Sequence, residues 1–156
     1  MRINYKGANH LLSAFLTGNS FIPFDPASQL HSRCIGYVSA AMFLMKTKGY
    51  LNPQCNYAFR KLPNGRPFDE LLGDENIWVS ILMNDYVLAQ SSEKDIAVSM
   101  LSFSQAFKRK DGVDYIASIL VHELAHVNGA PMSNMQAEDV LLPCGFSQFY
   151  NPNSHS

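Results

Sequence analysis

The stretch that most constrains this chain of 156 residues is Ile119-Leu120-Val121-His122-Glu123-Leu124-Ala125-His126. Its two histidines are four residues apart, and on an α-helix that spacing puts both imidazoles on one face, about one turn apart. An apolar stripe on another side of the same helix comprises Ile116, Leu120, Leu124 and Val127. The pattern therefore predicts a helix that packs on a core and turns its histidines toward a cleft.

The residues His122, Glu123 and His126 suit a catalytic zinc site. Zinc binds neutral imidazole readily, and a catalytic zinc keeps a water beside three protein ligands. Glu123 lies one residue round the helix from His122, so its carboxylate can reach that water instead of the metal. Because zinc lowers the pKa of a bound water to about 7, Glu123 is the natural general base. The sequence thus predicts two histidine ligands and one catalytic carboxylate.

The same string can also arise by chance, with both histidines hydrogen-bonded on the surface of an ordinary helix. The neighbouring residues argue against this alternative, because residues 119–121, Leu124, Ala125 and Val127 are all apolar. A buried helix has little reason to carry two histidines and a glutamate unless something satisfies them. The pattern therefore favours the metal hypothesis.

The motif helix and a second helix have recognisable ends. Asp111 or Asp114 suits the N-terminus of the motif helix, because acidic side chains stabilise the positive end of a helix dipole. Glycine is favoured just past a helix end, so the helix should stop at Asn128-Gly129. The second helix is expected to start with Ser32 as its cap and to end near residue 49. Its apolar residues at helical spacing are Ile35, Val38, Met42 and Met45.

Strands are expected in the middle of the chain. Residues 77–83 are the best candidate, and residues 96–100 are a weaker one. Residues 50–74 are rich in loop signals, with a possible short strand at 56–62 before a tight turn at Asn64-Gly65.

Composition fits one globular domain with a single core. Hydrophobic residues make up 47% of the chain, charged residues 16%, and the net charge is −1. Near-zero charge without a basic patch argues against nucleic acid as the main partner. The run Lys108-Arg109-Lys110-Asp111-Gly112 reads as a solvated turn, too short to indicate a polyanion partner. The longest apolar block, residues 34–45, is far shorter than the roughly 20 residues that a membrane span needs.

The N-terminus and the cysteines bear on the compartment. Arg2 and Lys6 precede a short apolar stretch, which makes a poor signal peptide, so an exported chain would need another route. A short helix is expected at residues 9–16. Three cysteines, Cys34, Cys55 and Cys144, do not make a disulfide framework. Three buried thiols in a reducing compartment are favoured over one disulfide and a free thiol.

A third metal ligand is needed, and Glu138 is the favoured residue. A capping-box pattern at residues 133–136 predicts a short helix that ends near Pro143 and Gly145 and carries Glu138 and Asp139. Glu138 should point inward, since its helical neighbours are Met135, Leu141 and Leu142. An inward carboxylate must be paired, and zinc would pair it.

Other roles stay open for these acidic residues. Glu138 could instead form a salt bridge or support a ligating histidine from behind. Asp139, expected to point outward, and His155 are alternative ligands. Cys144 is less suitable, because thiolates are more typical of closed structural zinc sites.

The motif and three later segments resemble the small zincin-type metallopeptidase domains of bacterial polymorphic toxins and type VI secretion effectors. The later segments are Gly129-Ala130-Pro131, Ala137-Glu138-Asp139 and Cys144-Gly145-Phe146. The short spacing from the second histidine to the acidic residue is also similar to that of deuterolysin-like peptidases, the aspzincins, in which Glu138 would occupy the place of an aspartate ligand. Two departures are Asn128, where zincins usually have an apolar residue, and Met132, where metzincins have a third histidine.

The resemblance implies a fold, a reaction and partners. The fold would be one zincin-like α+β domain over residues 1–156, with the strand at 78–83 as the edge strand of the substrate cleft. The reaction would be zinc-dependent hydrolysis of a protein or peptide, with Glu123 returning the proton to the leaving amine. Tyr150 or Tyr115 could donate to the oxyanion. A bacterial toxin of this kind would be secreted without a signal peptide into a target cell or periplasm, and an immunity protein could accompany it.

Two alternatives compete with a peptidase. One is an interaction module with a zinc site that lacks activity. The other is a metal-free domain whose histidines are surface features. Metal analysis separates the metal-free domain from the other two hypotheses. Substitution of Glu123 separates the peptidase from the interaction module.

Overall fold

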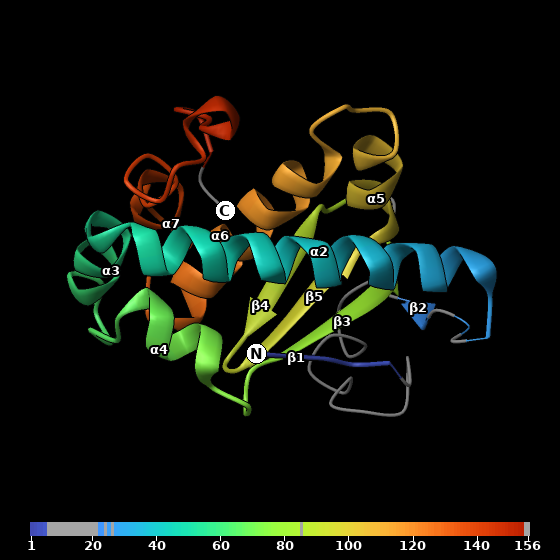
Figure 1. Cartoon of the computed structure of the whole chain (residues 1–156), viewed down its shortest axis with the longest axis horizontal. Helices are drawn as coiled ribbons and strands as arrows, with labels where there is room; N and C mark the ends of the chain where they lie inside the picture. Colours follow the sequence, from blue (N-terminus) through green and yellow to red (C-terminus); the bar gives the residue numbers. More distant parts are fainter. Residues whose placement is uncertain (6–21, 24, 26, 85, 155–156) are drawn as a thin grey trace.

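A computed structural model describes residues 1–5, 22–23, 25, 27–84 and 86–154 (Figure 1). Helices pack around a small mixed sheet, which confirms the predicted α+β class. The helix expected at residues 9–16 lies outside the described residues. Within the described ranges, every helix is too short or too polar to cross a lipid bilayer.

The sheet has five strands in the order β1-β3-β5-β4, with β2 pairing with one end of β3. The bounds are β1 Arg2–Ile3, β2 Ile22–Pro23, β3 Trp78–Met83, β4 Ala89–Ser92 and β5 Asp95–Ser99. β3 runs parallel to β1 and β5, whereas β4 is antiparallel to β5. The strands predicted at 77–83 and 96–100 are therefore both present, as β3 and β5.

The strand at residues 78–83 was predicted to be an edge strand, and that prediction is wrong. β3 has strands on both sides, so it lies inside the sheet and cannot be the edge strand of a cleft. In the described part of the chain the edge on the other side of β5 is β4, which pairs on one side only. β4 has partly buried side chains throughout and no apolar alternation, so its sequence gave no strand signal.

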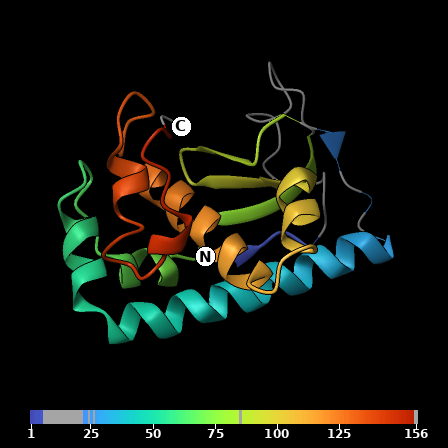
Figure 2. The same ribbon diagram turned by 90° about the horizontal axis from the view of Figure 1, so that it is seen from above.

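Two long helices form the centre of the molecule. α2 (Gln29–Leu51) passes in front of α6 (Gly112–Val127), and α6 lies on the β4 side of the sheet (Figures 1 and 2). α2 begins earlier than predicted, because Ser28 rather than Ser32 is the cap: its Oγ accepts the N–H of His31 at 3.0 Å. The fully buried side of α2 includes Cys34, Val38, Ala41 and Met45.

The motif helix α6 has the predicted ends. Its N-cap is Asp111, and Asn128 follows its last turn. Gly129 has φ +96°, the left-handed conformation that ends many helices and that favours glycine. Ile116, Leu120 and Leu124 are fully buried, so the predicted apolar stripe is the core side of the helix.

Residues 50–74, predicted as loops with a strand, contain two helices instead. α3 (Pro53–Arg60) replaces the strand expected at 56–62, and α4 (Phe68–Gly73) follows. Asn52 caps α3 by accepting two backbone N–H groups, and proline fits the first turn of a helix. The tight turn at Asn64-Gly65 is confirmed, since Gly65 has φ +67° and its N–H donates to Leu62 O.

The remaining helices are short: α5 (Met100–Ala106), α7 (Gln136–Asp139) and the 3₁₀ turn η2 (Ser147–Phe149). The helix predicted after the capping box is thus only four residues long. Asn134, not Ser133, accepts a backbone N–H at its start, from Gln136. The chain then proceeds through turns to Gly145, which has φ +86°.

The cysteines correct the favoured prediction of three thiols. Cys55 of α3 and Cys144 form a disulfide across 89 residues of sequence, and Cys34 is a buried free thiol. This is the alternative that the sequence left open.

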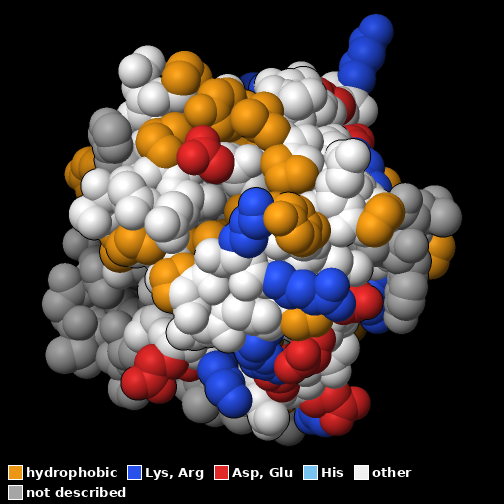
Figure 3. Space-filling view, turned by 90° about the vertical axis from the view of Figure 1, so that its left-hand side faces the viewer, with side chains coloured by type: hydrophobic (Ala, Val, Ile, Leu, Met, Phe, Trp, Pro, Cys, Tyr) orange, Lys and Arg blue, Asp and Glu red, His pale blue; other side chains and the backbone are white. Residues whose placement is uncertain are grey.

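Positive and negative side chains are interspersed on the face that carries the α3 end of the molecule (Figure 3).

Candidate metal centre and active-site pocket

The two motif histidines face each other across one turn of α6. Their Nε2 atoms are 3.2 Å apart, and their ring planes are inclined by 71°. Two nitrogens bound at about 2.0 Å to one tetrahedral zinc would be separated by about 3.3 Å. The spacing of the two Nε2 atoms therefore matches that of two ligands of one zinc ion.

The opposite ring nitrogens, Nδ1, are both held by acceptors. His126 Nδ1 lies 2.7 Å from Ala130 O, and His122 Nδ1 lies 2.8 Å from Glu138 Oε2. A carbonyl or carboxylate oxygen at this distance accepts, so each Nδ1 donates its proton to its partner. The two Nε2 atoms are then left facing each other within hydrogen-bond distance, so a proton or a metal cation can lie between them. Acceptors at Nδ1 are typical of metal-binding histidines.

The backbone after α6 brings Ala130 to His126. Gly129 N–H donates to His126 O, and Ala130 N–H donates to Ala125 O. A Cβ on Gly129 would lie 3.0 Å from both Asn64 Oδ1 and Pro63 Cβ, so the tight approach adds to the need for a positive φ. Asn128, the departure from an apolar residue, is fully buried, and its amide bonds Phe59 O and Arg66 O.

Glu138 points inward as predicted, but it does not have the geometry of the predicted third ligand. It is only 6% exposed, and its Oε2 holds the Nδ1 side of His122, away from the side where the Nε2 atoms meet. Its Oε1 accepts the N–H of Asn151 at 2.7 Å. Both oxygens are engaged, and this arrangement favours the alternative role of Glu138 as a support for His122, while its role as third ligand stays a prediction.

The other third-ligand candidates are not brought into the site. Asp139 is exposed, and its Oδ1 accepts the hydroxyl of Tyr150. Cys144 is in the disulfide, and His155 lies outside the described residues. In the part of the chain that the structure describes, no group of three or more His, Cys, Asp or Glu residues could hold one metal ion.

Glu123 is a buried carboxylate next to both imidazoles. It is 6% exposed, and within the described chain its Oε2 has no hydrogen-bond partner. Burial raises the pKa of Glu123, while His122, His126 and a hydrogen bond from Ser91 act in the opposite direction. A carboxylate with a raised pKa accepts a proton more readily, which suits a general base.

A pocket of about 340 Å³ opens beside His122, Glu123 and Glu138. Its apolar lining includes Leu88, Ala89, Ile119, Leu141 and Phe149, and its polar lining includes Arg109, Ser118, Gln148 and Asn151. Tyr115 also lines it, and its hydroxyl bonds the side chain of Gln105. Tyr150 is not among its described lining residues, so Tyr115 has the better position of the two predicted oxyanion donors.

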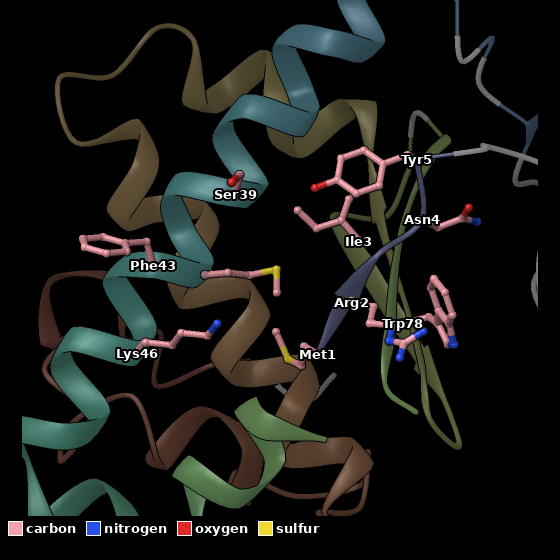
Figure 4. Close-up of a pocket in the computed structure, with 10 residues that line it drawn as sticks. Met1, Arg2, Ile3, Asn4, Tyr5, Ser39, Phe43, Lys46 and Trp78 are labelled. Atoms are coloured by element: carbon pink, nitrogen blue, oxygen red, sulfur yellow. The ribbon is translucent and has the colours of Figure 1, made fainter. Parts of the chain in front are cut away.

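A larger cavity of about 720 Å³ lies elsewhere, between β1 and α2 (Figure 4). Its described lining includes Arg2, Phe43, Lys46 and Trp78, with neither histidine nor carboxylate. It lacks the motif histidines and Glu123, so the candidate site remains the smaller pocket.

Sequence reasoning missed three parts of this site. The Ala130 carbonyl contacts His126, the Ser91 hydroxyl bonds Glu123, and the Asn151 N–H bonds Glu138. Gly129 signalled a turn that could bring a carbonyl back to the helix, but no sequence signal pointed to Ser91 or Asn151. Protein-family models, curated proteins and solved structures gave no match to this chain.

Proposed function

We propose that this chain is a zinc-dependent peptidase in which His122 and His126 hold the metal and Glu123 is the general base. The observation that supports this most is the pair of Nε2 atoms 3.2 Å apart, each in a ring whose Nδ1 is already held by an acceptor. The donor set suits zinc, which prefers imidazole nitrogen.

Zinc bound here would act as a Lewis acid and lower the pKa of a water to about 7. Glu123 would be the residue that accepts a proton from the attacking water and returns it to the leaving amine. Glu138 and the Ala130 carbonyl keep the imidazoles oriented. The Tyr115 hydroxyl is the candidate donor to the developing oxyanion, and it would have to give up its hydrogen bond to Gln105 in order to donate there.

The edge strand supports a peptide as the substrate. β4 lies next to α6, and its first residue, Ala89, lines the pocket. A strand that pairs on one side only offers backbone N–H and C=O groups to an extended peptide. A peptide added to β4 would pass alongside His122 and Glu123.

The compartment and partners follow from the same proposal. The Cys55–Cys144 disulfide suits an oxidising compartment, such as a periplasm or the exterior of a cell. We therefore keep the hypothesis of a secreted bacterial effector, with an immunity protein in the cell that makes it.

The test is the variant Glu123→Gln, which removes the base and keeps the shape. Labelled casein is the substrate, and zinc content is measured on the same samples. We expect the variant to keep its zinc and to lose about 10²–10⁴-fold in hydrolysis rate, the contribution typical of a general base. Asp139→Asn is the matched control, because it neutralises an exposed carboxylate nearby, and it should leave the rate within twofold.

A zinc-containing interaction module is the second candidate. It is favoured by the engagement of both Glu138 oxygens, which leaves two protein ligands in the described site. It predicts zinc without hydrolysis, so equal rates for wild type and Glu123→Gln would support it and contradict the peptidase.

A further inference from the structure

The lining of the candidate pocket includes two carboxylates and one cation. Glu123 and Glu138 line it next to His122, whereas Arg109 lines it beside Tyr115 and Phe149. Arg109 is the one lysine or arginine among the described lining residues. Tyr115, on which Arg109 packs, lies seven residues or about two turns before His122 on α6. A substrate group bound in the pocket can therefore meet a positive charge away from the two carboxylates.

Arg109 is held in place by two rings and one carboxylate. Its guanidinium carbon lies 5.0 Å from the ring centre of Tyr115 and 5.2 Å from that of Phe149. Nε and Nη2 bind the two oxygens of Asp111 at 2.8 and 3.2 Å. A side chain with 42% exposure would otherwise sample many rotamers, so these contacts preorganise the cation.

The turn that carries Arg109 is fixed as well. Arg109 N–H donates to Ala106 O at the end of α5. A Cβ on Gly112 would lie only 2.3 Å from Ala106 O, so only glycine permits this close approach of α6 to α5. The charged run expected to be a solvated turn thus has a defined position at the pocket.

Donor capacity remains on the guanidinium after these contacts. Arginine has five N–H groups, and the two bonds to Asp111 use two of them. Asp111 is not a described lining residue of the pocket, whereas Arg109 is. The remaining N–H groups can therefore bind an anion from the pocket, and a planar guanidinium suits a carboxylate.

We propose that the Arg109 end of this pocket binds a carboxylate of the substrate, so that peptides with an acidic group beside the cleaved bond are preferred. The carboxylate is either an acidic side chain or the free C-terminus of a peptide. The part of this inference that concerns cleavage rests on the proposed peptidase function, whereas carboxylate binding does not.

The experiment compares matched peptides on the zinc-loaded protein. A set of ten-residue peptides carries Glu or Gln at one position at a time, each made with a free or an amidated C-terminus. We expect wild type to favour Glu at one position, or a free over an amidated C-terminus, by at least tenfold in kcat/KM. The Glu and Gln series identifies a side-chain carboxylate, and the acid and amide series identifies a C-terminal one.

The variants are Arg109→Gln and Arg109→Lys, with Lys108→Gln and Lys110→Gln as controls. The control lysines are exposed neighbours that do not line the pocket, so they carry the same charge change without the contact. Arg109→Gln should lose the preference for the carboxylate, and Arg109→Lys should keep part of it. The control variants should keep the wild-type preference.

Three results would overturn the proposal: no preference for a carboxylate in wild type, an unchanged preference in Arg109→Gln, or equal losses in the two control variants. The first result needs no variant, so it applies even if Arg109→Gln fails to fold. If wild type cleaves none of the peptides, the peptidase proposal fails instead. Calorimetry with the same peptides then tests the carboxylate site without cleavage. We expect the acidic peptide of each matched pair to bind tenfold more tightly than the neutral one, and equal binding would contradict the site.

Discussion

Which ring nitrogen carries the proton decides what the two histidines can do. The Ala130 carbonyl and the Glu138 carboxylate fix the proton on Nδ1 of His126 and His122, so the Nε2 atoms are left to meet. Without these acceptors a ring could flip or change tautomer, and one Nε2 would become a donor. The residues that contact the Nδ1 atoms therefore orient the imidazoles for a metal.

Removing the acceptor behind His122 should weaken zinc binding. Glu138→Ala leaves Nδ1 of His122 without its carboxylate, and we expect zinc affinity to fall about 10–100-fold, as for other supporting residues of this kind. Glu138→Gln keeps an oxygen that can accept the same hydrogen bond, so it should lose clearly less. Competition with a chromophoric zinc chelator measures both.

The two variants also separate support from direct ligation. A glutamine is a poor zinc ligand, so equal, large losses for Glu138→Gln and Glu138→Ala would mean that the carboxylate binds zinc itself. Asp139→Asn is the neighbouring control and should bind zinc like wild type, since Asp139 is exposed and bonded to Tyr150.

At the scale of elements, sequence was informative where the signals were local. The ends and the buried side of α6 followed from Asp111, Gly129 and an apolar stripe. The strand at β3 followed from a run of apolar residues. By contrast, α3 was predicted as a strand, although Asn52 and Pro53 are a cap and a first-turn residue that could have indicated a helix.

Other elements depend on contacts between distant residues, which a single sequence does not reveal. β4 is a strand because it pairs with β5, and its own residues Ala89–Ser92 carry no strand pattern. The inward direction of Glu138 was predictable from its helical neighbours. Its partner atom was not, because that depends on how the segment after α6 folds back over the helix.

At the scale of the molecule, one covalent link holds the segment that carries Glu138. The disulfide joins Cys144, shortly after α7, to α3 across 89 residues, and Lys48 binds Gly145 O from α2. The segment from Gly129 to Ser154 has only α7 and η2 as regular structure, so these tethers should dominate its stability.

Breaking the disulfide should therefore lower the stability of the whole chain. We expect Cys55→Ser with Cys144→Ser to lose about 2–5 kcal/mol in free energy of unfolding, chiefly because the unfolded chain is no longer closed into a large loop. Urea denaturation of wild type, with and without reductant, and of the double variant measures this loss. Reductant should destabilise wild type and leave the variant unchanged, whereas an equal stability of all samples would contradict the link.

Zinc X-ray absorption of the tag-free chain tests the central claim most directly. We predict one zinc per chain with two imidazole nitrogens at about 2.0 Å, and loss of that zinc in both His122→Ala and His126→Ala. A chain that retains no zinc after loading, or zinc that is unchanged in either histidine variant, would contradict the account.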